Sequence, residues 1–194
     1  DNLKRMLAYS SVAHSGYILV GIITLITSGA EQSAATSVMF YIFSYALMTV
    51  GTFGLLGLLE SHEGKGITTE ELKGLADRHP MFALAFTVLL LSMAGLPPTL
   101  GFFGKFYIFS SAINQELYWL AFWGVLNSAI GVYFYLKPVV YMYMVEGRAI
   151  IMPKQLATKI IMGLSAVGVV VMGIAVQPAY KQIEKKVKAI IEEQ

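Results

Sequence analysis

The sequence predicts an all-α integral membrane protein with about five transmembrane helices. Of its 194 residues, 56% are hydrophobic and 13% are charged. A soluble domain usually carries about 25% charged residues. Most of the charged residues gather in four stretches, 1–5, 60–79, 146–159 and 181–194, with long apolar runs between them. Because a helix of about 20 apolar residues spans a bilayer core, these runs predict membrane-spanning helices.

The first two helices are predicted over residues 3–27 and 34–59, with a short turn at 28–32 between them. A polar stretch, 60–79, follows the second helix. Within it, Thr68 precedes Glu71 by three residues, which is the S/T-x-x-E pattern of a helix N-terminus. The pattern predicts a short surface helix in this stretch.

Residues 81–113 are too long for one span and barely long enough for two. Gly95, Pro97, Pro98 and Gly101 stand in the middle of this segment. Two adjacent prolines remove two backbone donors and clash with the preceding turn, so a continuous helix cannot pass through them. We expect one broken span, with half-helices 81–95 and 102–113 on one approximate axis. The alternative is a tight hairpin of two short helices. Broken helices at membrane depth occur where they are buried in protein or line a cavity, and they are typical of transport sites.

The last two spans are predicted over residues 117–143 and 156–176. Between 160 and 176 the only polar side chain is Ser165, so we expect this helix at the periphery of the bundle, facing lipid. The chain therefore divides into a transmembrane bundle, 1–180, and an amphipathic tail helix, 181–194. The apolar face of the tail would hold Ile183, Val187, Ile190 and Ile191.

The distribution of basic residues predicts the orientation of the bundle. An odd number of spans places the two ends of the chain on opposite sides of the membrane. The side of Lys4 and Arg5 would be cytoplasmic by the positive-inside rule, because the opposite side holds only Glu31 and Glu116 in its loops. The basic residues predicted on the cytoplasmic side are Lys4, Arg5, Lys65, Lys73, Arg78, Arg148, Lys154 and Lys159. The four lysines of the tail conflict with this assignment, but three nearby glutamates nearly offset them.

Lys105 is the strongest candidate for a functional residue. It lies nine residues before the predicted helix end at Asn114, which places it about 14 Å deep. A lysine can extend its side chain to the membrane surface, but the stem reaches only about 6 Å. An ionised lysine near the bilayer midplane is energetically costly and usually functional. Because removal from water favours the neutral amine, such a lysine can act as a proton carrier.

His14 lies ten residues beyond Lys4, so it is about 15 Å deep, at the level of Lys105. It is either a neutral histidine hydrogen-bonded within the bundle or a proton relay, since histidine titrates near physiological pH. The matching depth favours the relay. Other polar residues could complete a hydrophilic axis, although each alone is more often a helix-packing contact. They are Lys4, Ser10, Ser11, Ser44, Tyr45, Thr49, Asn127, Ser128 and Tyr133.

Several classes of chemistry are excluded by the composition. The chain has no cysteine, so it offers no disulfide, cysteine-ligated zinc, iron–sulfur ligand or thiol nucleophile. No phosphate-binding loop, nucleophile–base pair or metal-ligand cluster appears, and nothing indicates nucleic-acid binding. All twelve acidic residues lie in predicted loops or at helix ends, so Lys105 has no buried counterion within the chain. Asp1 stands directly before a hydrophobic helix, and we expect the chain to be part of a longer polypeptide.

Two motifs resemble signatures of the antiporter-like subunits of respiratory complex I. The first is Leu7-Ala8-Tyr9-Ser10-Ser11-Val12-Ala13-His14-Ser15-Gly16-Tyr17. The second runs from Leu91 to Tyr107 and includes Gly95-Leu96-Pro97-Pro98-Thr99 and Gly104-Lys105. The resemblance extends over most of residues 2–143, and the spacing between the motifs agrees as well.

Within that family, the Ala-His after Tyr-Ser-Ser resembles N-type subunits more than the L- and M-type paralogues. Lys105 disfavours the M-type, where glutamate is usual. The family fold has two inverted repeats of five helices, and this chain would cover most of the second. The glutamate–lysine pair of the first repeat is therefore outside it. By resemblance, Lys105 matches the terminal lysine on the second broken helix, implicated in proton exchange with one side of the membrane. His14 matches a position on the central hydrophilic axis.

The resemblance implies a proton-translocating, non-redox subunit of an NADH–quinone oxidoreductase in an energy-transducing membrane, the bacterial inner membrane. No cofactor is expected in this chain, whereas NADH, FMN, iron–sulfur clusters and quinone belong to other subunits. The expected partners are other membrane subunits of the complex, the lipid bilayer, water and protons. Two other readings stay open: a subunit of a multi-subunit Na⁺/H⁺ antiporter or related membrane-bound hydrogenase, and a structural membrane spacer.

Overall fold

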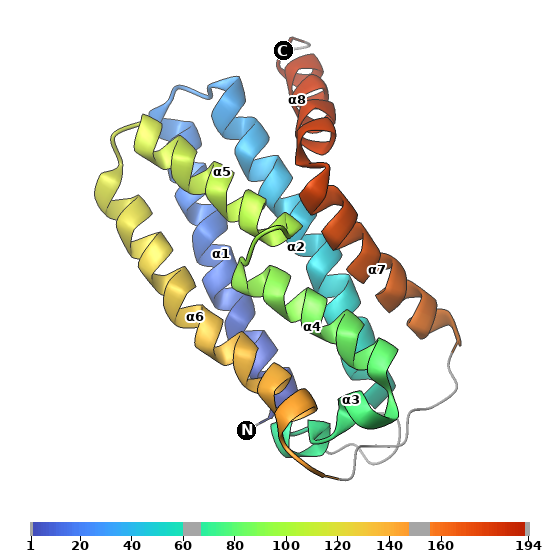
Figure 1. Ribbon diagram of the computed structural model, residues 1–194. Coiled ribbons are helices and arrows are strands. Elements are labelled where there is room, and N and C mark those ends of the chain that lie inside the picture. The colour runs from blue at the N-terminus through green and yellow to red at the C-terminus, as the bar shows by residue number, and fades with distance from the viewer. Residues whose placement is uncertain (1, 60–66, 148–155, 193–194) are drawn as a thin grey trace.

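The computed structural model describes residues 2–59, 67–147 and 156–192, and these residues form helices and connecting loops without a β-strand. The elements pack into an elongated bundle, in which the start of α1 and the end of α8 lie at opposite ends (Figure 1). In order they are α1 (Leu3–Thr27), α2 (Gln32–Leu59), the 3-10 helix η1 (Thr69–Leu72), α3 (Leu75–Arg78), α4 (Pro80–Ala94), α5 (Leu100–Asn114), α6 (Tyr118–Met144), α7 (Leu156–Ile174) and α8 (Val176–Glu192).

The apolar runs of the sequence locate the long helices to within two residues at each end. The predicted surface helix is the 3-10 helix η1, and its N-terminus has the predicted capping box between Thr68 and Glu71. The backbone N–H of Thr68 donates to Glu71 Oε2 at 2.6 Å. A second short helix, α3, was not predicted, because four residues are too few to show a helical repeat.

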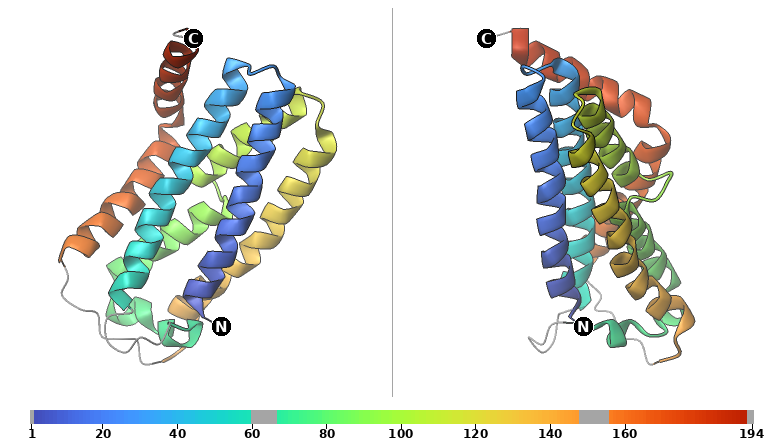
Figure 2. Two further views of the ribbon diagram at one scale, coloured as in Figure 1. Left: turned by 180° about the vertical axis from the view of Figure 1, so that it is seen from behind. Right: turned by 90° about the vertical axis from the view of Figure 1, so that its left-hand side faces the viewer.

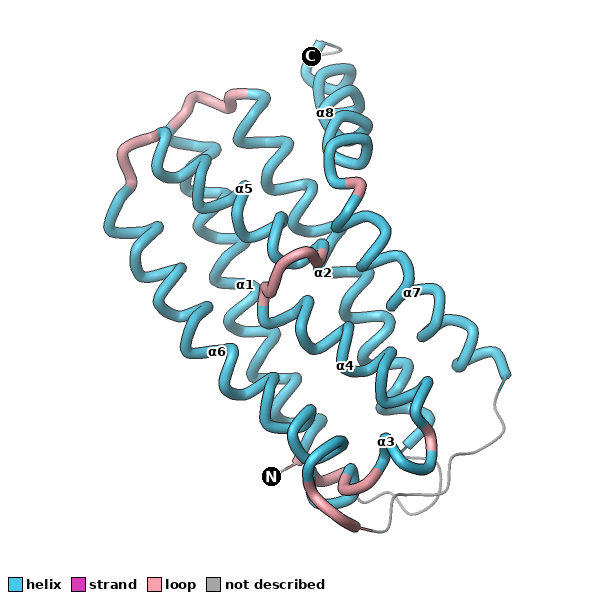
Figure 3. Tube along the Cα trace, in the orientation of Figure 1, coloured by secondary structure: helices cyan, strands magenta, loops and turns pink. Residues whose placement is uncertain are grey.

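The segment at Pro97-Pro98 is a broken helix that runs from one end of the bundle to the other. Ile67, just before η1, accepts a hydrogen bond from the N–H of Leu3, so the segment that leads into α4 lies at the end where α1 begins. At the opposite end, Gln115 after α5 donates to Glu31 in the turn between α1 and α2 at 3.2 Å. The two half-helices therefore follow each other in one direction, and the hairpin alternative is wrong. Their connecting loop crosses the middle of the bundle (Figure 3).

Helix α2 forms the centre of the bundle and packs against α1, α4, α5, α7 and α8. Figure 2 shows α1 and α2 side by side on one face, with the broken helix behind them. The core between these helices consists of large apolar side chains that are fully buried, including Phe40, Met48, Phe86, Leu89 and Leu90.

Helix α7 lies at one edge of the bundle and has two different faces. One face packs on α2, α4 and α5 and buries Met162, Ser165, Ala166 and Val169. The other face is exposed and carries Leu164, Val167 and Val171, in agreement with a position facing lipid.

The tail helix begins earlier than predicted, at Val176 rather than residue 181, and bends by 91° from α7 (Figure 1). The bend is stabilised by Tyr180, whose ring lies 4.3 Å from that of Tyr107 and 5.7 Å from that of Phe40. Of the predicted apolar face, Val187 is buried and Ile183 half-buried, whereas Ile190 and Ile191 are exposed. These tertiary contacts, rather than the charge pattern, set where the tail starts.

By length and composition, three of the described helices could each cross a membrane alone: α1, α2 and α6. The pair α7 and α8 passes the same test only as a bent unit, and α4 is a shorter apolar helix of 15 residues. Among the described residues this test gives three spans, or four if the bent pair counts as one, and the count of about five stays a prediction that takes α4 and α5 together as one broken span.

The predicted cytoplasmic end of the bundle holds the described basic residues Lys4, Arg5, Lys73, Arg78 and Lys159. Lys73 forms an ion pair with Glu70, and Gly74 lies against Gly147 just after α6, which closes this end. Lys65, Arg148 and Lys154, which were counted on the same side, lie outside the described residues.

Candidate functional site

The break between α4 and α5 ends α4 at mid-bundle, and each of the last four carbonyls of α4 has a hydrogen-bond donor. The last four carbonyls of a helix have no N–H donor within the helix and accept hydrogen bonds from other groups. In α4, the carbonyl of Leu91 accepts from the N–H groups of Gly95 and Leu96, and the carbonyl of Ser92 accepts from the N–H of Gly95. The carbonyls of Met93 and Ala94 accept from the side chain of Lys105, at 2.9 and 3.1 Å. The lysine of α5 thus completes the hydrogen bonding of α4.

A side chain of α4 in turn accepts a hydrogen bond from the first turn of α5. The N–H of Gly101 donates to the hydroxyl of Ser92 at 3.1 Å, and that hydroxyl in turn contacts Met48 Sδ at 2.9 Å. Gly101 was predicted to lie in the break, but it is the second residue of α5. A Cβ at Gly101 would lie 2.0 Å from the Ser92 carbonyl oxygen, so this glycine permits the close approach of the two half-helices.

Lys105 is buried, with 6% of its surface exposed, and points toward the helix break rather than the membrane surface. Besides the two carbonyls, it donates to Ser128 Oγ of α6 at 2.9 Å. Its nitrogen also lies 5.1 Å from the centre of the Tyr17 ring. Among the described residues it forms no ion pair. All of its hydrogen-bond partners are neutral oxygens, so a charged or a neutral amine could occupy the same place.

Gly95 makes room for the lysine. Its φ of +86° lies in the left-handed region, which a glycine adopts without strain and which ends α4. A Cβ there would lie 3.1 Å from Lys105 Cδ and 3.2 Å from Lys105 Nζ. The break therefore requires glycine at this position both for the backbone conformation and for the space beside the amine.

His14 is buried, with 1% of its surface exposed, and both of its ring nitrogens are hydrogen-bonded. Nδ1 lies 2.7 Å from the Tyr41 hydroxyl of α2, and Nε2 lies 3.1 Å from the Tyr135 hydroxyl of α6. Tyr135 is in turn hydrogen-bonded to Ser10. The ring of Tyr45 stacks on the imidazole at a centroid distance of 4.6 Å. These groups form a continuous hydrogen-bonded chain from Ser10 to Tyr41.

Tyr17 lies between the two predicted groups. Its ring packs edge-on against His14 at 5.7 Å and faces the nitrogen of Lys105 on another side. Its hydroxyl accepts a hydrogen bond from Asn127 Nδ2 at 3.0 Å. His14 and Lys105 therefore contact the same tyrosine in the interior of the bundle.

We call the buried group of Lys105, His14, Tyr17, Tyr41 and Tyr135 the polar cluster. Some of the remaining predicted residues contact this cluster and others do not. Ser10, Tyr45, Asn127 and Ser128 contact it directly, as described above. The hydroxyls of Ser11 and Ser44 instead donate to carbonyls of their own helices, at Ala8 and Phe40. Lys4 is exposed in the first turn of α1, and Tyr133 is 69% exposed, so neither side chain lies in the interior of the bundle. Thr49 has a buried hydroxyl without a hydrogen-bond partner among the described residues.

Three tyrosines of the cluster, Tyr17, Tyr41 and Tyr135, were not singled out from the sequence. A usable signal existed for Tyr17, which lies one helical turn after His14 and so shares its face. Tyr41 similarly precedes Tyr45 by four residues. Tyr135 carried no such signal, because it differs from Tyr133 only in the direction in which it leaves α6.

A pocket adjoins the polar cluster, and another lies away from it. A pocket of about 520 Å³ between α1 and α6 is lined by Ser10 and Tyr135 at one part and by Arg5 and Lys137 at another. The described residues contain no cluster of three or more histidine or acidic side chains that could hold a metal ion. A second pocket, between α4 and α7, contains none of the cluster residues.

Comparison with known sequences identifies relatives over nearly the whole chain. A profile for the transmembrane family "NADH:quinone oxidoreductase/Mrp antiporter" matches residues 1–131. The chain is 50% identical over 186 residues to NADH-quinone oxidoreductase subunit N of Bdellovibrio bacteriovorus, covering 95% of this chain and 38% of that protein. It is 47% identical over 178 residues to subunit N 1 of Sorangium cellulosum, covering 90% of this chain and 35% of that protein. The chain therefore spans less than two fifths of the length of these two relatives.

Comparison with solved structures finds the same arrangement of helices. A chain of respiratory complex I from Thermus thermophilus superposes with a TM-score of 0.75 and 26% identity, covering 93% of this chain and 40% of that one. A chain of the Mrp complex from Dietzia superposes with a TM-score of 0.79 and 19% identity, over 93% of this chain and 41% of that one. At 19% identity, the likeness to the Mrp chain shows a common fold and no more.

Proposed function

Because the chain belongs to the transmembrane family of NADH:quinone oxidoreductases and Mrp antiporters, we propose that it forms part of an N-type, proton-translocating subunit of NADH-quinone oxidoreductase. In this proposal Lys105 and His14 are the groups that transfer protons. The relatives with 50% and 47% identity both carry the name of subunit N of that enzyme, which supports it over a Na⁺/H⁺ antiporter subunit.

The observation that carries the proposal is the set of acceptors around Lys105. An ammonium group has three N–H donors, and the three oxygens of Met93, Ala94 and Ser128 can accept all of them. A neutral amine has two N–H donors and one lone pair. The two carbonyls can accept those N–H groups, while the Ser128 hydroxyl rotates and donates to the lone pair. The site therefore satisfies both forms, and loss of a proton breaks no ion pair.

The His14 chain provides a second segment of the path. A histidine with a hydroxyl on each ring nitrogen can accept a proton on one side and release one on the other, provided that both hydroxyls reorient. Ser10 and Tyr135 line the pocket between α1 and α6, so we assign proton exchange with the cytoplasmic side to that pocket. Tyr17 separates His14 from Lys105, and water beside its hydroxyl and Asn127 would complete the transfer between them.

The driving reaction is assigned to other subunits. We propose that NADH, FMN, iron–sulfur clusters and quinone are bound elsewhere in the complex and that this chain acts as a non-redox part of the translocase. Its partners are then other membrane subunits, and its location is the bacterial inner membrane with Lys4 and Arg5 on the cytoplasmic side.

The test is NADH-driven proton uptake by inverted membrane vesicles that contain the full-length subunit in the assembled complex. Lys105→Ala and Lys105→Arg should both abolish or sharply reduce uptake per NADH oxidised, because arginine does not release its proton. Lys185→Ala, which removes an exposed lysine of α8, is the matched control and should pump normally. Wild-type uptake in the arginine variant would reduce Lys105 to a fixed charge. Wild-type uptake in the alanine variant would leave the chain as a structural spacer.

A further inference from the structure

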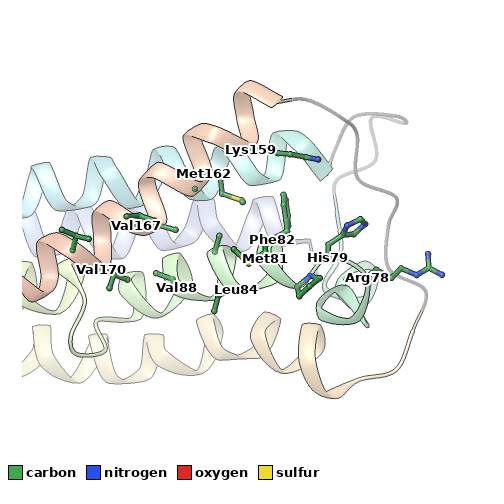
Figure 4. A pocket seen from close by; sticks show the side chains of 15 residues that line it. Arg78, His79, Met81, Phe82, Leu84, Val88, Lys159, Met162, Val167 and Val170 are labelled. Carbon is green, nitrogen blue, oxygen red and sulfur yellow. The ribbon is translucent and has the colours of Figure 1, made fainter.

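An open groove of about 700 Å³ runs between α4 and α7, outside the polar cluster. Figure 4 shows side chains from both helices that face it. Its walls are apolar over most of their length: Met81, Leu84 and Val88 come from α4, and Val167, Val170 and Val171 come from α7. Met81, Leu84, Val167 and Val171 are also more than one third exposed, so nothing in the described chain covers this surface.

One end of the groove is positively charged. Arg78 and His79 precede α4, and Lys159 lies in the first turn of α7; all three are near the same end of the groove in Figure 4. No acidic side chain is among the described residues that line the groove. The N-terminus of α4, with its partial positive charge, begins at this end as well. The groove thus has apolar walls and a basic end, which match the apolar acyl chains and the charged headgroup of an anionic lipid.

The length of the groove corresponds to one leaflet of a bilayer. On α7 the lining runs from Lys159 to Val171, twelve residues further along the helix, which is about 18 Å of helix. Half of a hydrocarbon core of roughly 30 Å is about 15 Å. A membrane-spanning helix of a partner would need contact over the whole core, and a quinone has no charge to pair with a lysine.

We propose that this groove binds one anionic glycerophospholipid. Its phosphate contacts Lys159 and the imidazole of His79, and one acyl chain lies along the valines of α7 and the apolar residues of α4. Arg78 takes part in another interaction and adds positive charge to the same end. Basic pockets between transmembrane helices are known recognition sites for anionic headgroups, and one basic residue near the membrane surface contributes about 1 kcal/mol.

The test uses the assembled complex in phosphatidylcholine vesicles that contain a photoactivatable phosphatidylglycerol, with crosslinked peptides identified by mass spectrometry. We expect crosslinks to α4 and α7 around Met81 and Val167. Lys159→Gln should lower the yield about fivefold, which corresponds to about 1 kcal/mol, and should lower that of a photoactivatable phosphatidylcholine less, because its choline offsets the charge of the phosphate. Gly163→Leu should lower the yield of both, because a side chain at this lining position enters open space in the groove.

Two matched variants control for general effects of the substitutions. Lys185→Gln removes an exposed lysine on α8, and Gly57→Leu adds a side chain in open space on α2; both should leave the crosslinks unchanged. Equal yields for the two lipids in the wild type would overturn the recognition of negative charge. In a separate experiment, the Val167→Cys variant is treated with a thiol-reactive crosslinker. A crosslink to another subunit, together with the absence of lipid crosslinks, would show that a protein helix fills the groove.

Discussion

The side-chain nitrogen of Lys105 lies 2.9 Å from the carbonyl oxygen of Met93, so the lysine of one half-helix completes the hydrogen bonding of the other. The same residue that would carry the proton is therefore also a structural part of the helix break. When the lysine loses a proton, both carbonyls at the end of α4 can keep an N–H donor, and the hydrogen bond that reverses is the one with Ser128. Effects of substitutions here must be measured on assembled complex.

The hydroxyl of Ser128 is the partner that must reverse its role when Lys105 loses a proton. Ser128→Ala should reduce proton uptake per NADH oxidised about fivefold, the equivalent of one hydrogen bond of about 1 kcal/mol, while the complex stays assembled. Ser11→Ala is the control, because that hydroxyl bonds only to Ala8 of its own helix. Unchanged uptake in the Ser128 variant would remove the hydroxyl from the mechanism.

Tyr135 and Tyr133 lie two residues apart on α6 and differ in surroundings. Tyr135 joins Ser10 to His14, whereas Tyr133 is 69% exposed. Tyr135→Phe should lower proton uptake severalfold, because it interrupts the hydrogen-bonded chain, and Tyr133→Phe should not. The measurement is proton uptake in vesicles at equal NADH oxidation. Equal effects of the two variants would contradict the path through His14.

Gly95 is predicted to tolerate no side chain. Gly95→Ala places a Cβ in a left-handed conformation, which costs roughly 1–2 kcal/mol, and crowds the Lys105 amine. We expect a lower melting temperature of the purified complex and reduced proton uptake. Gly16→Ala on α1, where a Cβ meets nothing within 4 Å, should instead leave stability unchanged or raise it. Wild-type behaviour of the Gly95 variant would show that the loop can rearrange.

Ser92 connects α4 to the first turn of α5. Ser92→Ala leaves the buried N–H of Gly101 without a partner, and we expect about 1–3 kcal/mol of destabilisation, seen as a lower thermal midpoint. Ser44 is equally buried, but its hydroxyl bonds to the Phe40 carbonyl of its own helix. Ser44→Ala should therefore cost less. A lower thermal midpoint for Ser44→Ala than for Ser92→Ala would show that the hydrogen bond from Gly101 to Ser92 does not stabilise the break.

Gly173 of α7 lies against the break loop. A Cβ at this position would be 2.2 Å from the Pro98 carbonyl oxygen, and backbone atoms cannot move aside as a flexible side chain can. Gly173→Ala should impair assembly, measured as the amount of complex purified from membranes. Gly163→Ala on the same helix meets open space and should assemble normally. Normal assembly of both variants would mean that α7 does not hold the loop.

The local chemistry of the sequence was sufficient to determine the long helices and the break between α4 and α5. The runs of apolar residues located α1 and α6 almost to the residue, because a bilayer requires about 20 apolar residues per span. The prolines at 97 and 98 determined the break, since a residue without an N–H cannot continue a helix. The constant rise of a helix predicts one depth for His14 and Lys105, and in the structure both residues contact Tyr17.

Only the tertiary structure decided which side chains meet. It placed Tyr135 rather than Tyr133 beside His14, turned Ser44 to its own backbone, and gave Ser92 and Lys105 their capping roles across the break. In a soluble protein, alternation of polar and apolar residues marks the buried face of a helix. In a membrane, lipid and protein interior are similarly apolar, so the apolar residues of helices such as α1 and α6 do not mark which face is buried. Their sequences therefore specify that they span the bilayer, and packing against neighbouring helices alone determines which face turns inward.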